Sequence, residues 1–327
     1  MKKILGINFL ILIILILSLE LILNIFNLSQ IMGVDRNLIV KDKDNFRLKK
    51  NSIGEIFGEK VYTDDNGFRV PNKNFKYSLD KPSIFFIGDS TTLGNGIKEE
   101  KTFVGKLRIK KNDFDVYNSS VIGYQFFHHE KNLNLINEFP KIAKIFYVFT
   151  LNDVFQVEQV KGIVEENNEQ KKRDFVNKIK SFKLINSINV FFRNKSHIYM
   201  LFKGLASDPS KRYFKYVKEY YNDKNNYNFE KNYLLKLKKI SQNKNINLNV
   251  LILPYEFQTR KNECNIKNLK PQKKIKGLLK SLEINYIEFT DLFCKQKNPK
   301  NLFLKYDPMH LSEEGHDLVF NILEKKV

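Results

Sequence analysis

Cysteine is scarce in this chain of 327 residues, which contains only Cys264 and Cys294. Two thiols are too few for a cysteine-rich metal site or for a small fold held together by disulfides. Two interpretations of the pair remain open. The thiols form one disulfide if the domain lies outside the cytoplasm, or they are two small buried side chains.

Acidic residues are also under-represented, with 36 Asp and Glu against 56 Lys and Arg, which gives a formal net charge of +20. Such an excess suits a nucleic-acid binder, but the lysines are spread among Asn and Ile rather than gathered in one stripe. The sequence also lacks a helix-turn-helix, a zinc finger or an RNA-recognition motif. We therefore expect no nucleic-acid partner, while attraction to an anionic surface such as lipid headgroups or an acidic glycan stays open.

The N-terminal apolar run lacks the small residues at which a signal peptide is cleaved. Ile4 to Leu28 is almost wholly aliphatic and, as a helix, long enough to cross a hydrocarbon core of about 30 Å. No Ala-x-Ala-like site lies between Leu19 and Gly33, and no cysteine follows the run to carry a lipid. We predict a transmembrane signal anchor over residues 1–30.

The charges around this run predict its orientation. Lys2 and Lys3 precede it and favour a cytoplasmic N-terminus, so the rest of the chain is expected on the periplasmic or extracellular side of a single-pass membrane protein. The many downstream lysines weaken this little, because large domains translocate largely regardless of charge. Glu20 interrupts the span, and we expect it at the outer interface or, alternatively, against a partner helix.

The composition changes twice along the remaining chain. Residues 31–81 are polar, with an Asn66-Gly67 turn, and we predict a stalk that leads into the main domain. In residues 82–327, short runs of Ile, Val and Phe alternate with longer amphipathic stretches, which is typical of βαβ units. The predicted strands are Ser83 to Ile87, Asp115 to Asn118, Lys144 to Phe149, Asn249 to Leu253 and Asn285 to Ile287.

Helical patterns lie between these strands. They cover Thr102 to Lys110, Phe126 to Phe139, Phe229 to Gln242, Lys273 to Leu282 and a segment after Ser312. The alternation predicts an α/β fold, a three-layer α/β/α sandwich around a parallel sheet of about five strands.

Residues 155–228 are too many for a simple connection, and we predict a helical insertion there. Four aromatic residues of this segment, Phe191, Phe192, Tyr199 and Phe202, are expected to pack the insertion onto the main domain. An acyl-binding lid and a membrane-facing surface are the alternatives.

The first predicted strand ends in Gly88-Asp89-Ser90-Thr91. Open α/β sheets place their ligands at such strand ends, and Ser90 would begin a helix whose free N–H groups favour negative charge. Asp89 and Ser90 alone also fit ordinary helix caps. The glycines at 88, 94 and 96 match neither a P-loop nor a dinucleotide-binding fingerprint.

Near the C-terminus, Asp307 precedes His310 by three residues in a loop ahead of a helix that Ser312 would cap. A serine hydroxyl is a poor nucleophile until an imidazole takes its proton, and that imidazole needs a carboxylate to orient it. A surface loop with a capping Asp is the plainer alternative.

Together these segments resemble the SGNH/GDSL hydrolases along most of residues 83 to 320. The resemblance is strongest in Gly88-Asp89-Ser90-Thr91 with Leu93-Gly94-Asn95-Gly96-Ile97, and in Asp307-x-x-His310-Leu-Ser-x-x-Gly315-His316. Asn118-Ser-Ser-Val-Ile-Gly123 and Asn152-Asp153 follow the second and third strands in the expected order, and Asp65 to Arg69 is similar to the lead-in of membrane-tethered relatives.

The resemblance implies a flavodoxin-like fold and a role for each matching residue. It makes Ser90 the nucleophile, His310 the general base and Asp307 the residue that holds the imidazole. The backbone N–H groups of Ser90 and Gly123 and the amide of Asn152 would form the oxyanion hole. Gly123 as a turn glycine and Asn152 as a cap are the alternatives. Where the family usually has Gly two residues before this Asn, the chain has Thr150.

These roles predict an esterase that needs no metal or organic cofactor. An outward-facing domain makes acyl or acetyl esters on cell-envelope glycans or lipids the expected substrates. Two alternatives remain: an O-acyltransferase acting on exopolysaccharide with the same triad, and a tethered, non-catalytic binding protein on a hydrolase scaffold.

Overall fold

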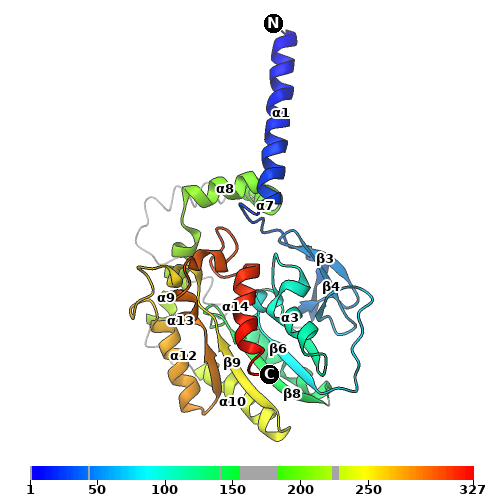
Figure 1. The fold of residues 1–327 in the computed structure, drawn as a ribbon, viewed down its shortest axis with the longest axis vertical. Coiled ribbons are helices and arrows are strands. Elements are labelled where there is room, and N and C mark those ends of the chain that lie inside the picture. The colour runs from blue at the N-terminus through cyan, green and yellow to red at the C-terminus, as the bar shows by residue number, and fades with distance from the viewer. Residues whose placement is uncertain (1, 43–44, 140, 155–182, 223–227) are drawn as a thin grey trace.

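The protein is described by a computed structural model that covers residues 2–42, 45–139, 141–154, 183–222 and 228–327. Five parallel strands form its central sheet in the order β10-β9-β8-β6-β7 (Figure 1). Their bounds are β6 Ser83–Ile87, β7 Asp115–Asn118, β8 Ile142–Phe149, β9 Asn247–Ile252 and β10 Asn285–Glu288. The predicted fold class and number of strands are confirmed.

Helices cover both faces of this sheet because its central strands carry apolar side chains on both sides. Phe85 and Ile87 of β6 belong to one core cluster, whereas Ile84 and Phe86 belong to the other. The first cluster is completed by α4 Phe126–Lys131, α9 Pro209–Asn222, α10 Asn228–Asn243 and α12 Lys270–Ser281. The second is completed by α3 Phe103–Lys110, α13 Thr290–Cys294 and α14 Glu313–Leu323.

Short helical turns complete the domain. They are α2 Ser90–Leu93, α11 Glu256–Thr259 and the 3₁₀ turns Arg36–Leu38, Glu99–Lys101, Leu133–Glu138 and Pro299–Leu302. The helix predicted from Phe126 to Phe139 is in fact divided, because α4 ends at Lys131 and a 3₁₀ turn continues to Glu138.

The N-terminal helix α1, Lys2–Ile25, projects from the rest of the molecule (Figure 1) and is long and apolar enough to cross a membrane. The carboxylate of Glu20 accepts hydrogen bonds from Ser196 Oγ and Ile198 N, both at 3.1 Å. These groups lie at the start of α8, His197–Ala206. Glu20 therefore contacts a second helix of the same chain, and its depth in a membrane remains a prediction.

The polar segment after α1 is folded rather than an extended stalk. It forms a β1–β2 hairpin and a small antiparallel β3-β4-β5 sheet. The strands are β1 Ile39–Asp42, β2 Asn45–Leu48, β3 Ile53–Ile56, β4 Glu59–Thr63 and β5 Arg69–Val70. Leu48, Ile56 and Val61 bury one face against Leu93 and Val121, close to the predicted nucleophile.

The predicted insertion lies only partly within the described residues, since 155–182 and 223–227 fall outside them. Its described part contains α7 Lys183–Lys195, α8 and α9. The expectation that Phe191, Phe192 and Phe202 pack onto the main domain is wrong, because all three are exposed. Phe214, Val217 and Tyr221 of α9 supply the packing instead.

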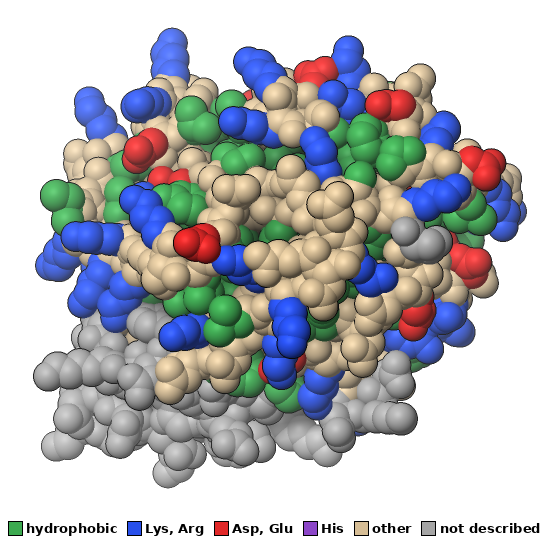
Figure 2. Space-filling model, turned by 90° about the horizontal axis from the view of Figure 1, so that it is seen from below, with side chains coloured by type: hydrophobic (Ala, Val, Ile, Leu, Met, Phe, Trp, Pro, Cys, Tyr) green, Lys and Arg blue, Asp and Glu red, His purple; other side chains and the backbone are tan. Residues whose placement is uncertain are grey.

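Cys264 and Cys294 are joined by a disulfide, which ties the segment after α11 to the end of α13. The first of the two interpretations of the cysteines therefore describes the structure. Figure 2 shows the face opposite α1, where Lys and Arg side chains are scattered between acidic and polar residues rather than gathered in a stripe.

Candidate active site

Ser90 stands at the carboxyl end of β6, as the first residue of α2. Asp89 caps this short helix by accepting a hydrogen bond from Thr91 N at 2.8 Å. Only glycine fits at position 88, since a Cβ there would lie 2.2 Å from Thr92 Oγ1. Gly88 therefore allows Thr92 to approach the backbone closely, and Ser90 stands at the carboxyl edge of the sheet.

The structure brings the three predicted catalytic residues together. Asp307 Oδ1 accepts hydrogen bonds from the backbone N–H groups of Met309 at 2.9 Å and His310 at 2.8 Å, which fixes the loop. Asp307 Oδ2 lies 2.7 Å from His310 Nδ1, and His310 Nε2 lies 2.8 Å from Ser90 Oγ. An unbroken chain of hydrogen bonds thus runs from carboxylate to imidazole to hydroxyl.

Two influences on the His310 imidazole oppose each other. Burial of the ring disfavours its charged form, but the charge of Asp307 and its hydrogen bond outweigh burial and raise the pKa of His310. Phe57 packs edge-on against the ring, with centroids 5.1 Å apart. The imidazole is therefore oriented by Asp307 on one side and held by an apolar ring on another.

The predicted oxyanion-hole residues lie at the ends of the two neighbouring strands. Gly123 follows β7 with φ of +75°, a backbone conformation that favours glycine. Its segment is tied to the Ser90 turn by a 3.2 Å hydrogen bond from Val121 N to Gly88 O. Asn152 follows β8, and its Nδ2 lies 3.5 Å from Asp89 Oδ2. The role of both groups in stabilising an oxyanion remains a prediction.

Tyr255 positions Asn152, and sequence reasoning did not identify it. Its hydroxyl donates a 2.6 Å hydrogen bond to Asn152 Oδ1, which turns the amide N–H₂ the other way, toward Asp89. Tyr255 follows the carboxyl end of β9, so the rule that ligands gather at strand ends points to it. Phe57 comes from the β3–β4 turn, and the sequence contained no comparable signal for it.

Thr150, the departure from the family pattern, bridges two buried carboxyl groups. Its Oγ1 lies 2.8 Å from Asp89 Oδ2 and 3.0 Å from Asp153 Oδ1. Burial raises the pKa of Asp89, and burial together with the nearby Asp89 charge raises the pKa of Asp153 well above its usual range. The Thr150 hydroxyl has one proton, so it can donate a hydrogen bond to only one of the two carboxyl groups. It accepts a hydrogen bond from the other carboxyl group when that group is protonated.

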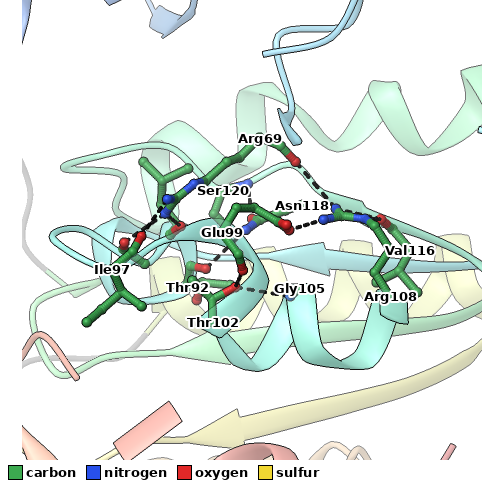
Figure 3. A network of polar contacts seen from close by, with 12 residues as sticks. Arg69, Thr92, Ile97, Glu99, Thr102, Gly105, Arg108, Val116, Asn118 and Ser120 are labelled. Carbon is green, nitrogen blue, oxygen red and sulfur yellow. Dashed lines mark hydrogen bonds and ion pairs between the residues drawn. The ribbon is translucent and has the colours of Figure 1, made fainter. Parts of the chain in front are cut away.

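Arg69 secures the loop that follows the nucleophile (Figure 3). This fully buried guanidinium donates from Nη1 to the carbonyl oxygens of Leu93 at 2.5 Å and Gly94 at 2.7 Å, and from Nη2 to that of Ile97 at 2.6 Å. Burial lowers the pKa of Arg69 to about 10, which leaves it cationic at neutral pH. A second buried arginine, Arg108, pairs with Glu99 beside it. The hydrogen bonds of Arg69 therefore hold the segment from Ser90 to Ile97 in place.

Residues of the described chain offer no cluster of three or more His, Cys, Asp or Glu side chains suited to a metal ion. His316, the last residue of the C-terminal motif, is buried against Phe103, and its Nδ1 accepts a 3.2 Å hydrogen bond from Phe103 N. Burial lowers the pKa of His316 to about 3, so it is a neutral structural residue.

Three comparisons place the chain among known proteins. No family model matches it, and no curated protein matches it. Among solved structures, it is similar to a member of the lipolytic protein G-D-S-L family from Veillonella parvula, with 14% identity, 74% of this chain and 96% of the other covered, and a TM-score of 0.42.

Two further structures are similar to the same degree. The lipase/acylhydrolase from Enterococcus faecalis has 11% identity over 75% of this chain and 94% of the other, with a TM-score of 0.43. The acetyl xylan esterase AlAXEase has 12% identity over 75% and 99%, with a TM-score of 0.43. At these values the likeness carries no weight for the activity, and the site is defined by the contacts within this chain.

Proposed function

We propose that this protein is a serine hydrolase of the SGNH/GDSL type that cleaves acyl esters. The observation that carries the proposal is the chain of hydrogen bonds from Asp307 through His310 to Ser90, at 2.7 and 2.8 Å. These contacts have the geometry of an activated nucleophile, its general base and the group that orients the base.

The proposed reaction has two steps. Ser90 Oγ attacks the ester carbonyl while His310 Nε2 takes the hydroxyl proton, and Asp307 stabilises the imidazolium that forms. The tetrahedral oxyanion accepts hydrogen bonds from the N–H groups of Ser90 and Gly123 and from the Asn152 amide. The intermediate expels the alcohol, which takes the proton from His310 and leaves an acyl-enzyme. Water then attacks the acyl carbonyl while His310 takes its proton, and His310 passes this proton to Ser90 Oγ as the bond to Ser90 breaks and the acid leaves. No metal or organic cofactor is needed.

The proposed location is a membrane, with α1 as a single-pass signal anchor and the domain on the periplasmic or extracellular side. The contacts of Glu20 with the start of α8 support retention of α1, because cleavage after it would remove a folded contact. Residues 31–81 would then belong to the same outward-facing unit as residues 82–327, which include the helices at 183–222. This location favours acyl or acetyl groups on envelope glycans or lipids as substrates.

An O-acyltransferase would use the same triad and the same acyl-enzyme, with a sugar hydroxyl in place of water. Incubating the enzyme with an acyl donor, with and without an exopolysaccharide acceptor, distinguishes the two. A hydrolase releases free acid in both cases, whereas a transferase leaves the acyl group on the sugar.

A variant of the nucleophile tests the proposal directly. We expect Ser90→Ala to lower kcat for a short-chain p-nitrophenyl ester by at least about 10³-fold, since it removes the attacking oxygen. Ser241→Ala is the matched control, because Ser241 is a buried serine whose hydroxyl donates to the Leu237 carbonyl within α10. Unchanged hydrolysis in Ser90→Ala would refute the proposed nucleophile and favour a binding protein.

A further inference from the structure

Helices α7 and α8 expose large apolar side chains, which a surface in contact with water usually lacks. Phe191, Phe202 and Leu205 are 62%, 63% and 67% exposed. Ile188, Phe191 and Phe192 recur at helical spacing, so they share one side of α7. Phe202 and Leu205 likewise share one side of α8. We refer to these five residues as the α7–α8 face.

The α8 part of this face points away from the catalytic domain. Gly204 lies against the domain, since a Cβ at that position would be 2.2 Å from the Tyr306 ring. At about 100° per residue, Phe202 is turned about 160° and Leu205 about 100° from Gly204 around the helix axis. Figure 1 shows α8 beside the lower end of α1, at the end of the domain from which α1 projects. The exposed side of α8 is therefore turned toward the side from which α1 projects.

The start of α8 is fixed at one level along α1. Glu20 accepts from the first backbone N–H groups of α8, and Ser29 Oγ donates a 2.7 Å hydrogen bond to His197 O. The apolar stretch from Ile4 to Leu19 is about 24 Å long as a helix. The whole apolar run to Ile25 is about 33 Å long, which is enough for a hydrocarbon core of about 30 Å. Glu20 lies about 8 Å before the end of that run, so Glu20 and the start of α8 come near the outer boundary of a bilayer that α1 spans.

We infer that the α7–α8 face lies in the surface of the lipid bilayer, as an interfacial helix pair beside the anchor. Phe, Ile and Leu on one side of a surface helix, with basic residues nearby, are typical of helices whose apolar side enters the headgroup and acyl boundary. Arg193 and Lys195 at the end of α7 are exposed and suit anionic headgroups. The inference rests on the proposed membrane anchoring and not on the proposed hydrolysis.

The same helices contact the candidate active site from the other side. Gly204 packs on Tyr306, and Ser210 Oγ at the start of α9 donates a 3.2 Å hydrogen bond to the carbonyl oxygen of Asp307. Tyr306 has φ of 61°, a left-handed conformation that costs a non-glycine residue energy unless its surroundings hold it. Helix α8 and the start of α9 thus set the loop of the general base at a fixed place relative to the bilayer surface.

Depth-dependent quenching on the full chain tests the inference. The native cysteines are bonded to each other, so an introduced cysteine can be labelled alone. The variants Phe191→Cys and Phe202→Cys are each labelled with a fluorescent dye and placed in nanodiscs of phosphatidylcholine and phosphatidylglycerol. The emission of the dye is compared between lipids with brominated acyl chains and the same lipids without bromine. We expect bromine to reduce the dye's emission at both positions by about twofold or more. Ile109→Cys is the matched control, because Ile109 is equally apolar and exposed but lies at the end of α3, and it should show no quenching.

Each remaining result would overturn the inference. Dye at positions 191 and 202 that is quenched by aqueous iodide as strongly as at position 109, and not by bromine, would place the α7–α8 face in water. Dye shielded from both quenchers would place another protein, or a second copy of this chain, on the face. A Leu12→Cys probe in α1 that bromine fails to quench would remove the anchor itself. None of these results depends on ester hydrolysis, so failure here is distinguishable from failure of the proposed activity.

Discussion

At the scale of single residues, the chemistry depends on the charge state of one imidazole. His310 is a general base only when neutral, and its pKa is raised above the usual value of 6.5 because Asp307 outweighs the effect of burial. kcat/KM for ester hydrolysis should therefore fall as the pH drops through this raised pKa.

Replacing the carboxylate changes both the rate and this pH dependence. In Asp307→Asn the influence that raises the pKa is lost and burial remains, so the acidic limb of the profile should move to lower pH. The rate itself should fall by about 10⁴-fold because the asparagine amide no longer holds the imidazole in the tautomer that leaves Nε2 free to accept the Ser90 proton. Profiles of kcat/KM against pH measure both effects. Asp317→Asn, which breaks a surface ion pair with Lys106, should keep the wild-type profile, and an unshifted limb in Asp307→Asn would contradict the assignment.

The triad could be predicted because its members lie within short motifs, whereas their supporting residues could not. Asp307 and His310 are three residues apart, and Ser90 follows a buried strand, so these short motifs carry the family resemblance that implies their roles. Tyr255 reaches Asn152 from a residue 103 positions away. Contacts of that kind depend on how strands are ordered in the sheet, which the sequence did not reveal.

At the scale of helices and strands, burial decided which elements could be predicted. Strands β6 and β7 begin and end where the sequence placed them, and every residue of both is buried. The strands between residues 39 and 70 were not predicted. They have two to five residues each, so any alternation of apolar and polar residues is too short to detect.

The contact between α8 and the loop of the general base leads to a prediction at this scale. Gly204→Ala places a Cβ against the Tyr306 ring, so the neighbouring Asp307 must shift. We expect kcat for ester hydrolysis to fall by about 10-fold to 100-fold. The circular-dichroism spectrum of the folded protein should change little. Gly277→Ala in α12 is the control, since a Cβ there meets no atom within 4 Å. Equal activity in the two variants would show that α8 does not position this loop.

At the scale of the whole molecule, the anchor, the α7–α8 pair and the catalytic domain form one connected structure. Glu20 joins α1 to α8, and Gly204 joins α8 to the loop of Asp307. The net charge of +20 could be counted from the sequence, but its distribution could not. The basic side chains are scattered over the face opposite α1 (Figure 2), which agrees with the expectation of no nucleic-acid partner without testing it.

The disulfide contributes to the stability of the whole domain. Cys264 and Cys294 are separated by 30 residues, so their bond restricts the unfolded chain substantially. Replacing both with serine should lower the free energy of unfolding by about 3 kcal/mol. Because the chain has no tryptophan, circular dichroism is the suitable probe of urea unfolding. A reducing agent should lower the free energy of unfolding of the wild type and leave that of the double variant unchanged. Equal free energies of unfolding of the two proteins without a reducing agent would contradict the prediction.

The central claim is that Ser90 is an activated nucleophile. Labelling of the detergent-solubilised full chain with a fluorophosphonate probe tests it, since a serine activated by a base displaces fluoride from phosphorus and stays modified. We expect labelling of the wild type and of Ser241→Ala, and its loss in both Ser90→Ala and His310→Ala. Labelling that persists in Ser90→Ala, or a folded wild type that does not react at all, would contradict the claim.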